Sequence, residues 1–282
     1  MKTLRLLYPD YKSGGLDTYY FGSHLLAHIL PPNPNQPLLT VAIQSPNTQK
    51  SAVHDGIYAK EEVLAGIEDA YTKIESEKPD KIITIGGTCL VSLAPFDYLH
   101  GRYKNVGILW FDAHPDVSTI HDGYPYAHAM VLGTLLGNDQ TLPNVMRHEK
   151  FPASDVLYIG LQHLHTYQKD FLDNLGVRYT IQDKSIISDE EIDAFTKRFD
   201  AILIHFDIDV LNENLFHSTY FANKELVGDG SSGGKMTIPQ LSSILHRIDN
   251  TCNIVGFTIA EYLPFDEQKI HTMLSELSLF TD

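Results

Sequence analysis

The feature that most constrains the fold is a regular alternation of short apolar runs with longer amphipathic segments. The apolar runs lie near residues 3–8, 38–44, 81–86, 106–112, 155–161, 177–181, 201–207 and 253–260. Alternating strands and helices are typical of a parallel sheet, and strands that are apolar throughout are covered on both faces. We therefore predict an α/β protein, with a single domain spanning residues 1–282.

Helices are predicted in the intervals between most of these runs. Residues 60–76 place apolar side chains on one helical face. Ser188 and Thr237 precede amphipathic stretches at 189–199 and 238–248, and both residue types are favoured N-caps. These helices are expected to pack against the sheet.

Two of the apolar runs end in acidic motifs. Residues 112–116 (Asp-Ala-His-Pro-Asp) follow the run 106–111, and residues 207–209 (Asp-Ile-Asp) follow the run 201–206. Open α/β sheets bind ligands at the carboxyl ends of their strands. The two motifs therefore predict a functional site at this edge of the sheet.

The residue types in these motifs favour a metal site. A lone Asp after a strand usually caps a turn or a helix, but two such motifs place four carboxylates and an imidazole together. Neighbouring carboxylates repel unless a cation neutralises them. Carboxylate-rich sites with some imidazole suit Mn²⁺, Mg²⁺ or related ions, and two ions about 3.5–4 Å apart can share bridging carboxylates. The candidate ligands are Asp112, His114, Asp116, Asp207 and Asp209.

Composition argues against several classes of partner. The 21 Lys and Arg residues against 36 Asp and Glu residues give a net charge of −15, and no basic run offsets it. We expect no binding to nucleic acid or to an anionic membrane. Only Cys89 and Cys252 occur, which favours a reducing, cytoplasmic setting. The start of the chain is interrupted by Pro9 and does not resemble a signal peptide, and no apolar run approaches the ~20 residues of a membrane span.

The order and spacing of six motifs resemble the arginase/ureohydrolase family of amidinohydrolases, which includes arginase, agmatinase, guanidinobutyrase and formimidoylglutamase. The resemblance covers most of the chain. The motifs are Gly86-Gly-Thr-Cys89, Asp112-Ala-His-Pro-Asp116, His128-Ala-Met130, Asp207-Ile-Asp209, the Gly-rich run 228–234 and Glu261-Tyr-Leu-Pro264. The resemblance implies a three-layer α/β/α fold around a parallel sheet of about eight strands. It also implies a homo-oligomer such as a trimer or hexamer.

The resemblance implies a dinuclear manganese site. Asp112 and Asp207 would bridge the two ions. His114 and Asp209 would complete the ligands of one ion, and Asp116 would bind the other. A hydroxide bridging the ions would attack the planar carbon of a guanidinium or amidine.

Three residues receive catalytic roles from the same resemblance. Asp116 would accept a hydrogen bond from the nucleophile and pass a proton to the leaving nitrogen. His128 would shuttle protons. Glu261 would pair with the guanidinium of a small cationic substrate through a bidentate, charge-assisted contact.

The chain departs from the family at Cys89, where the familiar enzymes carry a histidine that ligates the first metal. A thiolate would be a softer ligand and would shift the preference from Mn towards Zn, Fe, Co or Ni. A neutral thiol would leave that position weakly held, with one ion instead of two. Both outcomes remain open at this stage. Gln162 and His163 stand where arginases contact the amino-acid end of arginine, which argues against arginine itself as the substrate.

The leading hypothesis is a metal-dependent hydrolase of a linear C–N bond in a guanidino or amidino compound. One alternative is a deacetylase-like amidohydrolase with a single metal ion. Another is a non-catalytic paralogue that binds metal, although the retention of all the carboxylates argues against it. Six histidines lack motif support and are interpreted as structural: His100, His121, His163, His165, His205 and His217.

Overall fold

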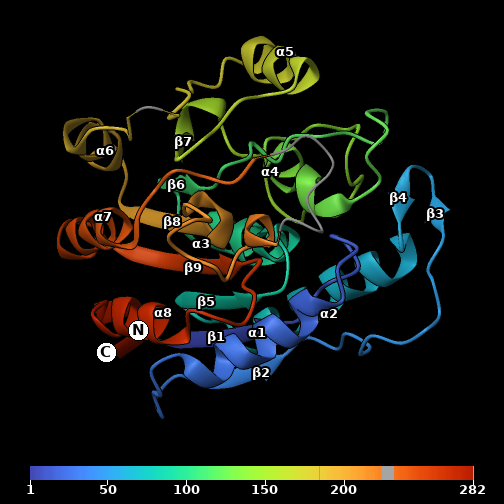
Figure 1. Cartoon of the computed structure of the whole chain (residues 1–282), viewed down its shortest axis with the longest axis horizontal. Coiled ribbons are helices and arrows are strands. Elements are labelled where there is room, and N and C mark those ends of the chain that lie inside the picture. Colours follow the sequence, from blue (N-terminus) through green and yellow to red (C-terminus); the bar gives the residue numbers. More distant parts are fainter. Residues whose placement is uncertain (184, 224–231, 282) are drawn as a thin grey trace.

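The apolar runs form one parallel sheet of seven strands within the described residues, which are 1–183, 185–223 and 232–281 of this computed structural model. The strand order is β2-β1-β5-β9-β8-β6-β7, and every neighbouring pair is parallel. Figure 1 shows the strands stacked in this order, with β7 at the top and β2 at the bottom. The strands are β1 (Thr3–Tyr8), β2 (Leu38–Thr40), β5 (Lys81–Gly86), β6 (Val106–Phe111), β7 (Val156–Ile159), β8 (Ala201–Asp207) and β9 (Ile254–Ala260).

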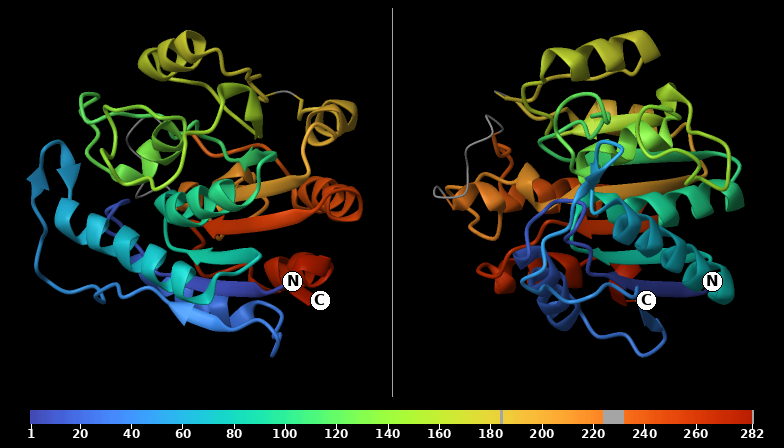
Figure 2. Two further views of the ribbon diagram at one scale, coloured as in Figure 1. Left: turned by 180° about the vertical axis from the view of Figure 1, so that it is seen from behind. Right: turned by 90° about the vertical axis from the view of Figure 1, so that its right-hand side faces the viewer.

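Helices cover both faces of this sheet and form two separate apolar cores with it (Figure 2). One core contains side chains of α2 (Lys60–Glu77), α3 (Leu93–Arg102), α4 (Val131–Leu135) and α5 (Thr166–Leu175). The other contains side chains of α1 (Thr18–Ile29), α6 (Asp189–Thr196), α7 (Ile238–Thr251), α8 (Glu267–Ser275) and α9 (Ser278–Thr281). The predicted three-layer α/β/α fold is confirmed.

The predicted N-caps are also found. The Ser188 hydroxyl accepts a hydrogen bond from the Glu191 amide at the start of α6, and the Thr237 hydroxyl accepts one from the Gln240 amide at the start of α7. Each cap is part of a capping box, which satisfies two backbone donors that a helix start leaves unpaired. Both helix starts were therefore correctly predicted from local sequence.

One expected strand, residues 177–181, is not formed. Here the Gln182 side chain takes the place of a strand backbone beside β7. Its Oε1 accepts from the Gly160 amide at 2.9 Å, and its Nε2 donates to the Tyr158 carbonyl at 3.0 Å. A side chain thus satisfies backbone groups at this edge of the sheet, so the sheet has seven strands where about eight were expected.

Two further local differences from the expected pattern occur. The run near 38–44 forms a strand only at Leu38–Thr40, because the Ala42 amide bonds to the Asp69 carboxylate at 2.7 Å and not to a strand. A short antiparallel hairpin, β3 (Val53–His54) and β4 (Ile57–Tyr58), lies outside the main sheet. Each strand of this hairpin has only two residues, too few for an alternating apolar and polar pattern to be recognised in the sequence.

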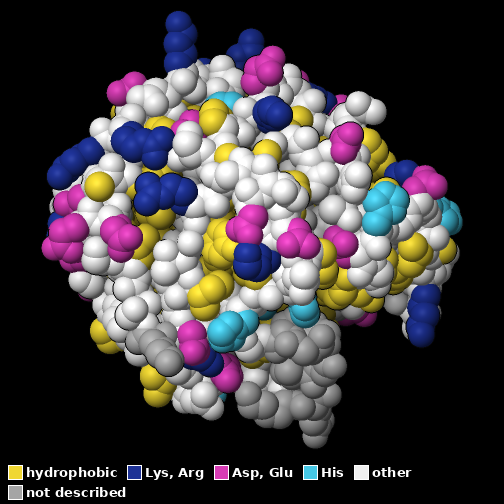
Figure 3. Space-filling model, turned by 90° about the horizontal axis from the view of Figure 1, so that it is seen from above, with side chains coloured by type: hydrophobic (Ala, Val, Ile, Leu, Met, Phe, Trp, Pro, Cys, Tyr) yellow, Lys and Arg dark blue, Asp and Glu magenta, His cyan; other side chains and the backbone are white. Residues whose placement is uncertain are grey.

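On the face seen in Figure 3, basic and acidic side chains are interspersed with apolar ones. Within the described residues, no helix has the length and the hydrophobicity needed to cross a bilayer.

Gly87, directly after β5, joins the ends of three strands. Its amide donates to the Tyr8 carbonyl at 3.0 Å, and its carbonyl accepts from the Glu261 amide at 3.1 Å. A Cβ atom at this position would lie 1.8 Å from the Asp10 carbonyl oxygen. Only glycine allows this approach, which sets the positions of the segments carrying Cys89 and Glu261.

We predict that Gly87→Ala lowers the free energy of unfolding by about 2–3 kcal/mol, because the overlap is with backbone and cannot be relieved by rotating a side chain. Urea unfolding followed by circular dichroism measures the change. The control is Gly133→Ala, whose added Cβ would meet the Val117 Cα at 3.3 Å, a tight contact without overlap. Equal losses in the two variants would contradict this account.

Candidate metal centre

The candidate residues meet where the carboxyl ends of the central strands reach one edge of the sheet. Asp112 follows β6 directly, Asp207 is the last residue of β8, and Glu261 follows β9. Cys89 begins a 3₁₀ turn, Cys89–Ser92, that leads into α3. Parallel strands place all these ends on the same side, which is why segments far apart in sequence converge here.

Two of the site residues have a strained backbone. Asp116 has φ = +50° and Glu261 has φ = +63°, in the left-handed region that non-glycine residues rarely adopt. Such conformations persist only where the surrounding structure enforces them, and they concentrate at functional sites. At Asp116 the carbonyl accepts from the Gly133 amide at 3.0 Å, which ties this loop to α4.

Cys89 lies among carboxylates. Its Sγ is 2.8 Å from Asp207 Oδ2 and 3.5 Å from Glu261 Oε1. Burial raises the pKa of the Cys89 thiol well above its usual value, and the nearby Asp116 and Asp207 raise it further. The thiol is therefore protonated in the metal-free protein, and only an added cation would favour the thiolate.

A second group consists of Asp112, His114 and Asp209, whose candidate ligand atoms lie within 4.8 Å of one another. His114 Nδ1 is 2.9 Å from Asp209 Oδ2 and 3.5 Å from Asp112 Oδ1. Asp207 forms another such group with Asp209 and Glu261. Because Asp207 also contacts Cys89, it lies between Cys89 and the Asp112–His114–Asp209 group.

Glu261 is held by two partners. Its Oε2 accepts from the Tyr19 hydroxyl at 2.5 Å, and its Oε1 is 2.7 Å from His128 Nδ1. His128 Nε2 is 3.1 Å from the Tyr124 hydroxyl. Burial acts to raise the pKa of Glu261, but the charge and hydrogen bond of His128 and the hydrogen bond of Tyr19 outweigh it and lower the pKa. Glu261 is therefore ionised, as a cation-binding residue requires. Tyr19 and Tyr124 had no motif that could identify them from sequence.

The carboxylates of the site differ in protonation. Burial raises the pKa of Asp116 and of Asp207 well above the usual value, and neighbouring carboxylates add to the effect. Burial likewise raises the pKa of Asp209 to about 6. For Asp112, burial acts in the same direction, but interactions with His114 and with His205 outweigh it and lower the pKa. The metal-free site thus limits its negative charge by holding protons on Asp116 and Asp207, and His114 beside Asp209 and Asp112 has a pKa raised well above its usual value by their charges, although burial opposes this.

The residues present fit divalent metal ions. Within the described residues, His114 Nε2, Asp116 Oδ2 and His205 Nε2 are buried and have no hydrogen-bond partner. Buried polar atoms are almost always paired, so three such atoms in one cluster indicate that a ligand belongs there. Carboxylate, imidazole and thiol donors are those of transition-metal sites.

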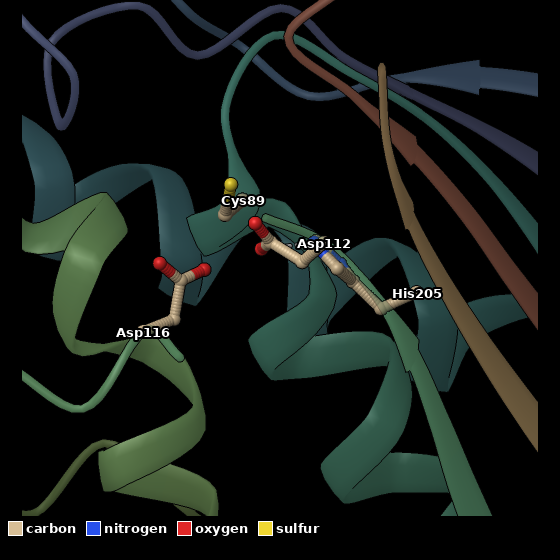
Figure 4. Close-up of side chains that lie close together, drawn as sticks. All are labelled: Cys89, Asp112, Asp116 and His205. Atoms are coloured by element: carbon tan, nitrogen blue, oxygen red, sulfur yellow. Dashed lines mark ion pairs between the residues drawn. The ribbon is translucent and has the colours of Figure 1, made fainter. Parts of the chain in front are cut away.

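His205, interpreted from sequence as structural, belongs to this cluster. Together with Cys89, Asp112 and Asp116 it forms a group whose candidate ligand atoms lie within 4.8 Å of one another. Figure 4 shows its ring directly beside the Asp112 carboxylate. The period of two along β8 places His205 on the same side as Asp207, but this arrangement is shared by any residue two positions before a site residue in a strand and does not identify a ligand.

The centre lies at the bottom of a cavity of ≈ 860 Å³. Among the described residues, six Tyr and Phe residues contribute to its wall, and its charged members are carboxylates apart from any protonated histidine. His163 lines the cavity, whereas Gln162 is buried and donates to the Gly160 carbonyl at 2.8 Å. Of the Gly-rich run 228–234, residues 228–231 lie outside the described residues and Ser232 lines the cavity.

Comparison with known proteins identifies the family of the chain. A model of the Arginase family matches residues 39–281. The chain belongs to the arginase family. The arginase of Entamoeba histolytica is 30% identical over 175 residues, which cover 56% of this chain and 56% of that protein. The match in sequence therefore spans just over half of the relative's length.

Two solved arginase-family structures show the same fold. The crystal structure of Entamoeba histolytica arginase with L-ornithine superposes with a TM-score of 0.79 at 18% identity, covering 97% of this chain and 96% of the other. Formimidoylglutamase from Bacillus subtilis gives a TM-score of 0.69 at 14% identity, covering 99% and 84%. Arginase-family proteins with different names thus share this architecture.

We predict that Asp209→Asn stabilises the chelated protein at pH 7.5 by on the order of 2 kcal/mol. The pKa of Asp209 is about 6 in the folded protein and is lower in the unfolded chain. The folded state therefore binds the proton of this carboxyl more tightly, and the stability that results is fully present below pH ~4 and is lost as pH rises through 6. The asparagine side chain is neutral both at pH 7.5 and near pH 4, where Asp209 is itself protonated in the folded protein and partly protonated in the unfolded chain. The advantage should therefore disappear near pH 4.

With saturating metal the sign should reverse, since the variant lacks a ligand and gains less from metal binding. Denaturant unfolding with and without chelator at pH 4.5 and 7.5 measures both effects. Asp170→Asn, on an exposed part of α5, is the control and should change stability by less than ~0.5 kcal/mol. A destabilised Asp209→Asn protein in chelator at pH 7.5 would contradict the prediction.

Proposed function

We propose that this arginase-family protein is a metal-dependent hydrolase of a linear C–N bond in a small guanidino or amidino compound. The observation that carries the proposal is the convergence of Cys89, Asp112, Asp116, Asp207 and Asp209 at the bottom of one cavity, with His114 and Glu261 beside them. Bound divalent ions supply hydroxide near neutral pH by lowering the pKa of water.

Asp112, His114, Asp207 and Asp209 would hold an ion on one side of the centre, and Asp116 with Cys89 would hold an ion on the other. This assignment is supported by the overlap of the ligand groups. The carboxylate and imidazole donors suit Mn²⁺, whereas the thiol of Cys89 suits Zn, Fe, Co or Ni.

Glu261 binds the substrate's cationic head. A carboxylate can accept about four hydrogen bonds, so the contacts with Tyr19 and His128 leave capacity for two N–H groups of a guanidinium. Because Tyr19 and His128 fix both oxygens, the carboxylate is oriented before the substrate arrives. Such preorganisation favours the reactive geometry.

Asp116 and His128 move protons. Asp116 has an unpaired Oδ2 facing the centre, where it can accept a proton from the attacking water and deliver it to the leaving nitrogen. His128 lies between Glu261 and Tyr124, so it joins the inner site to the cavity wall. It can replace the proton delivered to the product.

The residues of the cavity wall favour the binding of a cationic or neutral substrate. Tyr126, His163, Tyr167 and Phe221 line it, and the additional carboxylate of Asp122 adds negative charge. Aromatic faces and carboxylates both attract amines and guanidinium groups. A guanidino compound ending in an amine or an uncharged group is therefore a better candidate than arginine, whose carboxylate would meet these acids.

The deciding experiment measures metal content and then activity. Protein purified without added metal or a His-tag is analysed by elemental mass spectrometry, and the ion found is used to screen guanidino amines, guanidino acids and amidines. We expect release of urea, ammonia or formamide with the corresponding amine, and loss of at least ~100-fold in kcat/KM for Glu261→Gln. Cleavage of N-acetyl amines in place of guanidino compounds would overturn the proposal.

We predict that Tyr19→Phe lowers kcat/KM about 10-fold, the effect of losing one hydrogen bond to a charged group. Because that bond lowers the pKa of Glu261, its loss should also move the acid limb of the kcat/KM profile to higher pH. The matched control is Tyr11→Phe, whose buried hydroxyl has no hydrogen-bond partner in the described structure. An unshifted acid limb in Tyr19→Phe would show that Tyr19 does not position Glu261.

A further inference from the structure

We propose that His205 is a metal ligand and that it completes, with Cys89, Asp112 and Asp116, a buried position distinct in chemistry from the Asp112–His114–Asp209 group. The inference rests on the proposed metal-dependent function, because it requires an ion at this centre. It assigns to His205 a role that neither its sequence context nor the family comparison indicates.

The first observation is the unpaired nitrogen of His205. The side chain is fully buried, and Nε2 has no hydrogen-bond partner among the described residues. Its nearest charged atom is Asp112 Oδ2 at 3.6 Å, which is beyond hydrogen-bonding distance. That oxygen already accepts from Trp110 Nε1 at 3.1 Å. An imidazole that served only to fill the core would be expected to have both nitrogens satisfied.

The second observation is how the ring is held. Nδ1 is 2.8 Å from Ser92 Oγ, and the ring stacks on the Trp110 indole with a centroid separation of 3.7 Å and an interplanar angle of 12°. Trp110 and His205 are register partners on β6 and β8, so the sheet imposes the stacking, whereas Ser92 comes from the 3₁₀ turn Cys89–Ser92. When Nδ1 donates its proton to Ser92, Nε2 keeps a lone pair directed at the centre. Metal-binding histidines are commonly oriented through the second ring nitrogen in this way.

The third observation is the composition of the group. Cys89 Sγ, His205 and the carboxylates of Asp112 and Asp116 are four donors within mutual reach, and Asp116 Oδ2 is also unpaired. Figure 4 shows these four side chains close together, with Asp112 between His205 and the other two, from segments that follow β5 and β6 and from β8 itself. Sulfur and imidazole together favour Zn²⁺, Fe²⁺ or Co²⁺ over Mg²⁺ or Mn²⁺.

A difference between the two positions follows. The Asp112–His114–Asp209 group has one imidazole and otherwise oxygen donors, so it suits Mn²⁺ better than the group containing Cys89 and His205. His114, Asp116 and Cys89 line the cavity, whereas Asp112 and His205 lie beneath its surface. The ion bound by His205 is thus expected to be the more deeply buried and the more slowly exchanged.

The test compares wild-type protein with His205→Phe, which can keep the stacking on Trp110 and removes both nitrogens. Metal-free protein is titrated with Zn²⁺ by calorimetry, and bound ions are counted by elemental mass spectrometry. We expect two ions per chain in the wild type and one in His205→Phe. Zinc X-ray absorption should show that the imidazole scattering attributable to His205 is lost. His100→Phe, which replaces another stacked imidazole far from the centre, is the matched control and should retain two ions.

Two ions bound with unchanged affinity in His205→Phe would overturn the inference. So would weaker binding with unchanged imidazole scattering, because His205 would then only position Asp112. If His205→Phe does not fold in the presence of chelator, His205→Asn is judged by the same criteria. Two ions in the wild type without hydrolysis of any guanidino compound would refute the proposed function alone. Hydrolysis by the wild type with both ions retained in the His205 variants would refute the inference alone.

Discussion

The rest of the structure depends on one constraint, which is the burial of several carboxylates close together at the ends of parallel strands. Burial and mutual repulsion raise the pKa of Asp116, Asp207 and Asp209, so the metal-free centre is electrostatically unfavourable. Buried side-chain atoms without hydrogen-bond partners lie in the same cluster and indicate that a cation binds there. Divalent metal would relieve both problems at once, so binding of metal and stability of this region should be closely linked.

The fold supplies what the centre needs through its backbone. The parallel sheet brings the ends of β5, β6, β8 and β9 to one edge, and Gly87 allows the neighbouring segments to approach closely. The strained conformations of Asp116 and Glu261 then direct their carboxylates into the site. Around them, Tyr19 and His128 orient Glu261, and Trp110 with Ser92 orients His205. Each reactive side chain is therefore fixed by a neighbour from another segment.

Cys89, at the position where the resemblance leads us to expect a histidine, is best understood together with His205. Considered alone, Cys89 suggests a weakened metal position, because its thiol is protonated in the metal-free protein. In the folded chain an imidazole lies on the other side of Asp112, close enough to complete a four-donor group. The ligands of the position that contains Cys89 and His205 would then be softer than those of the Asp112–His114–Asp209 position. This difference gives a chemical reason for the protein to prefer Zn²⁺, Fe²⁺ or Co²⁺ over Mn²⁺ there.

Much of this protein was determined by local sequence. Apolar runs placed six strands within one or two residues, Ser188 and Thr237 marked two helix starts, and the acidic motifs predicted a cluster that the fold does assemble. These features depend on periodicity, capping and short spacings, which are local. The fold alone decided that Gln182 replaces an eighth strand, that Gln162 lies away from the cavity, and that Tyr19 and His205 belong to the site. Those outcomes depend on which side chains from distant segments face one another, and no local pattern carries that information.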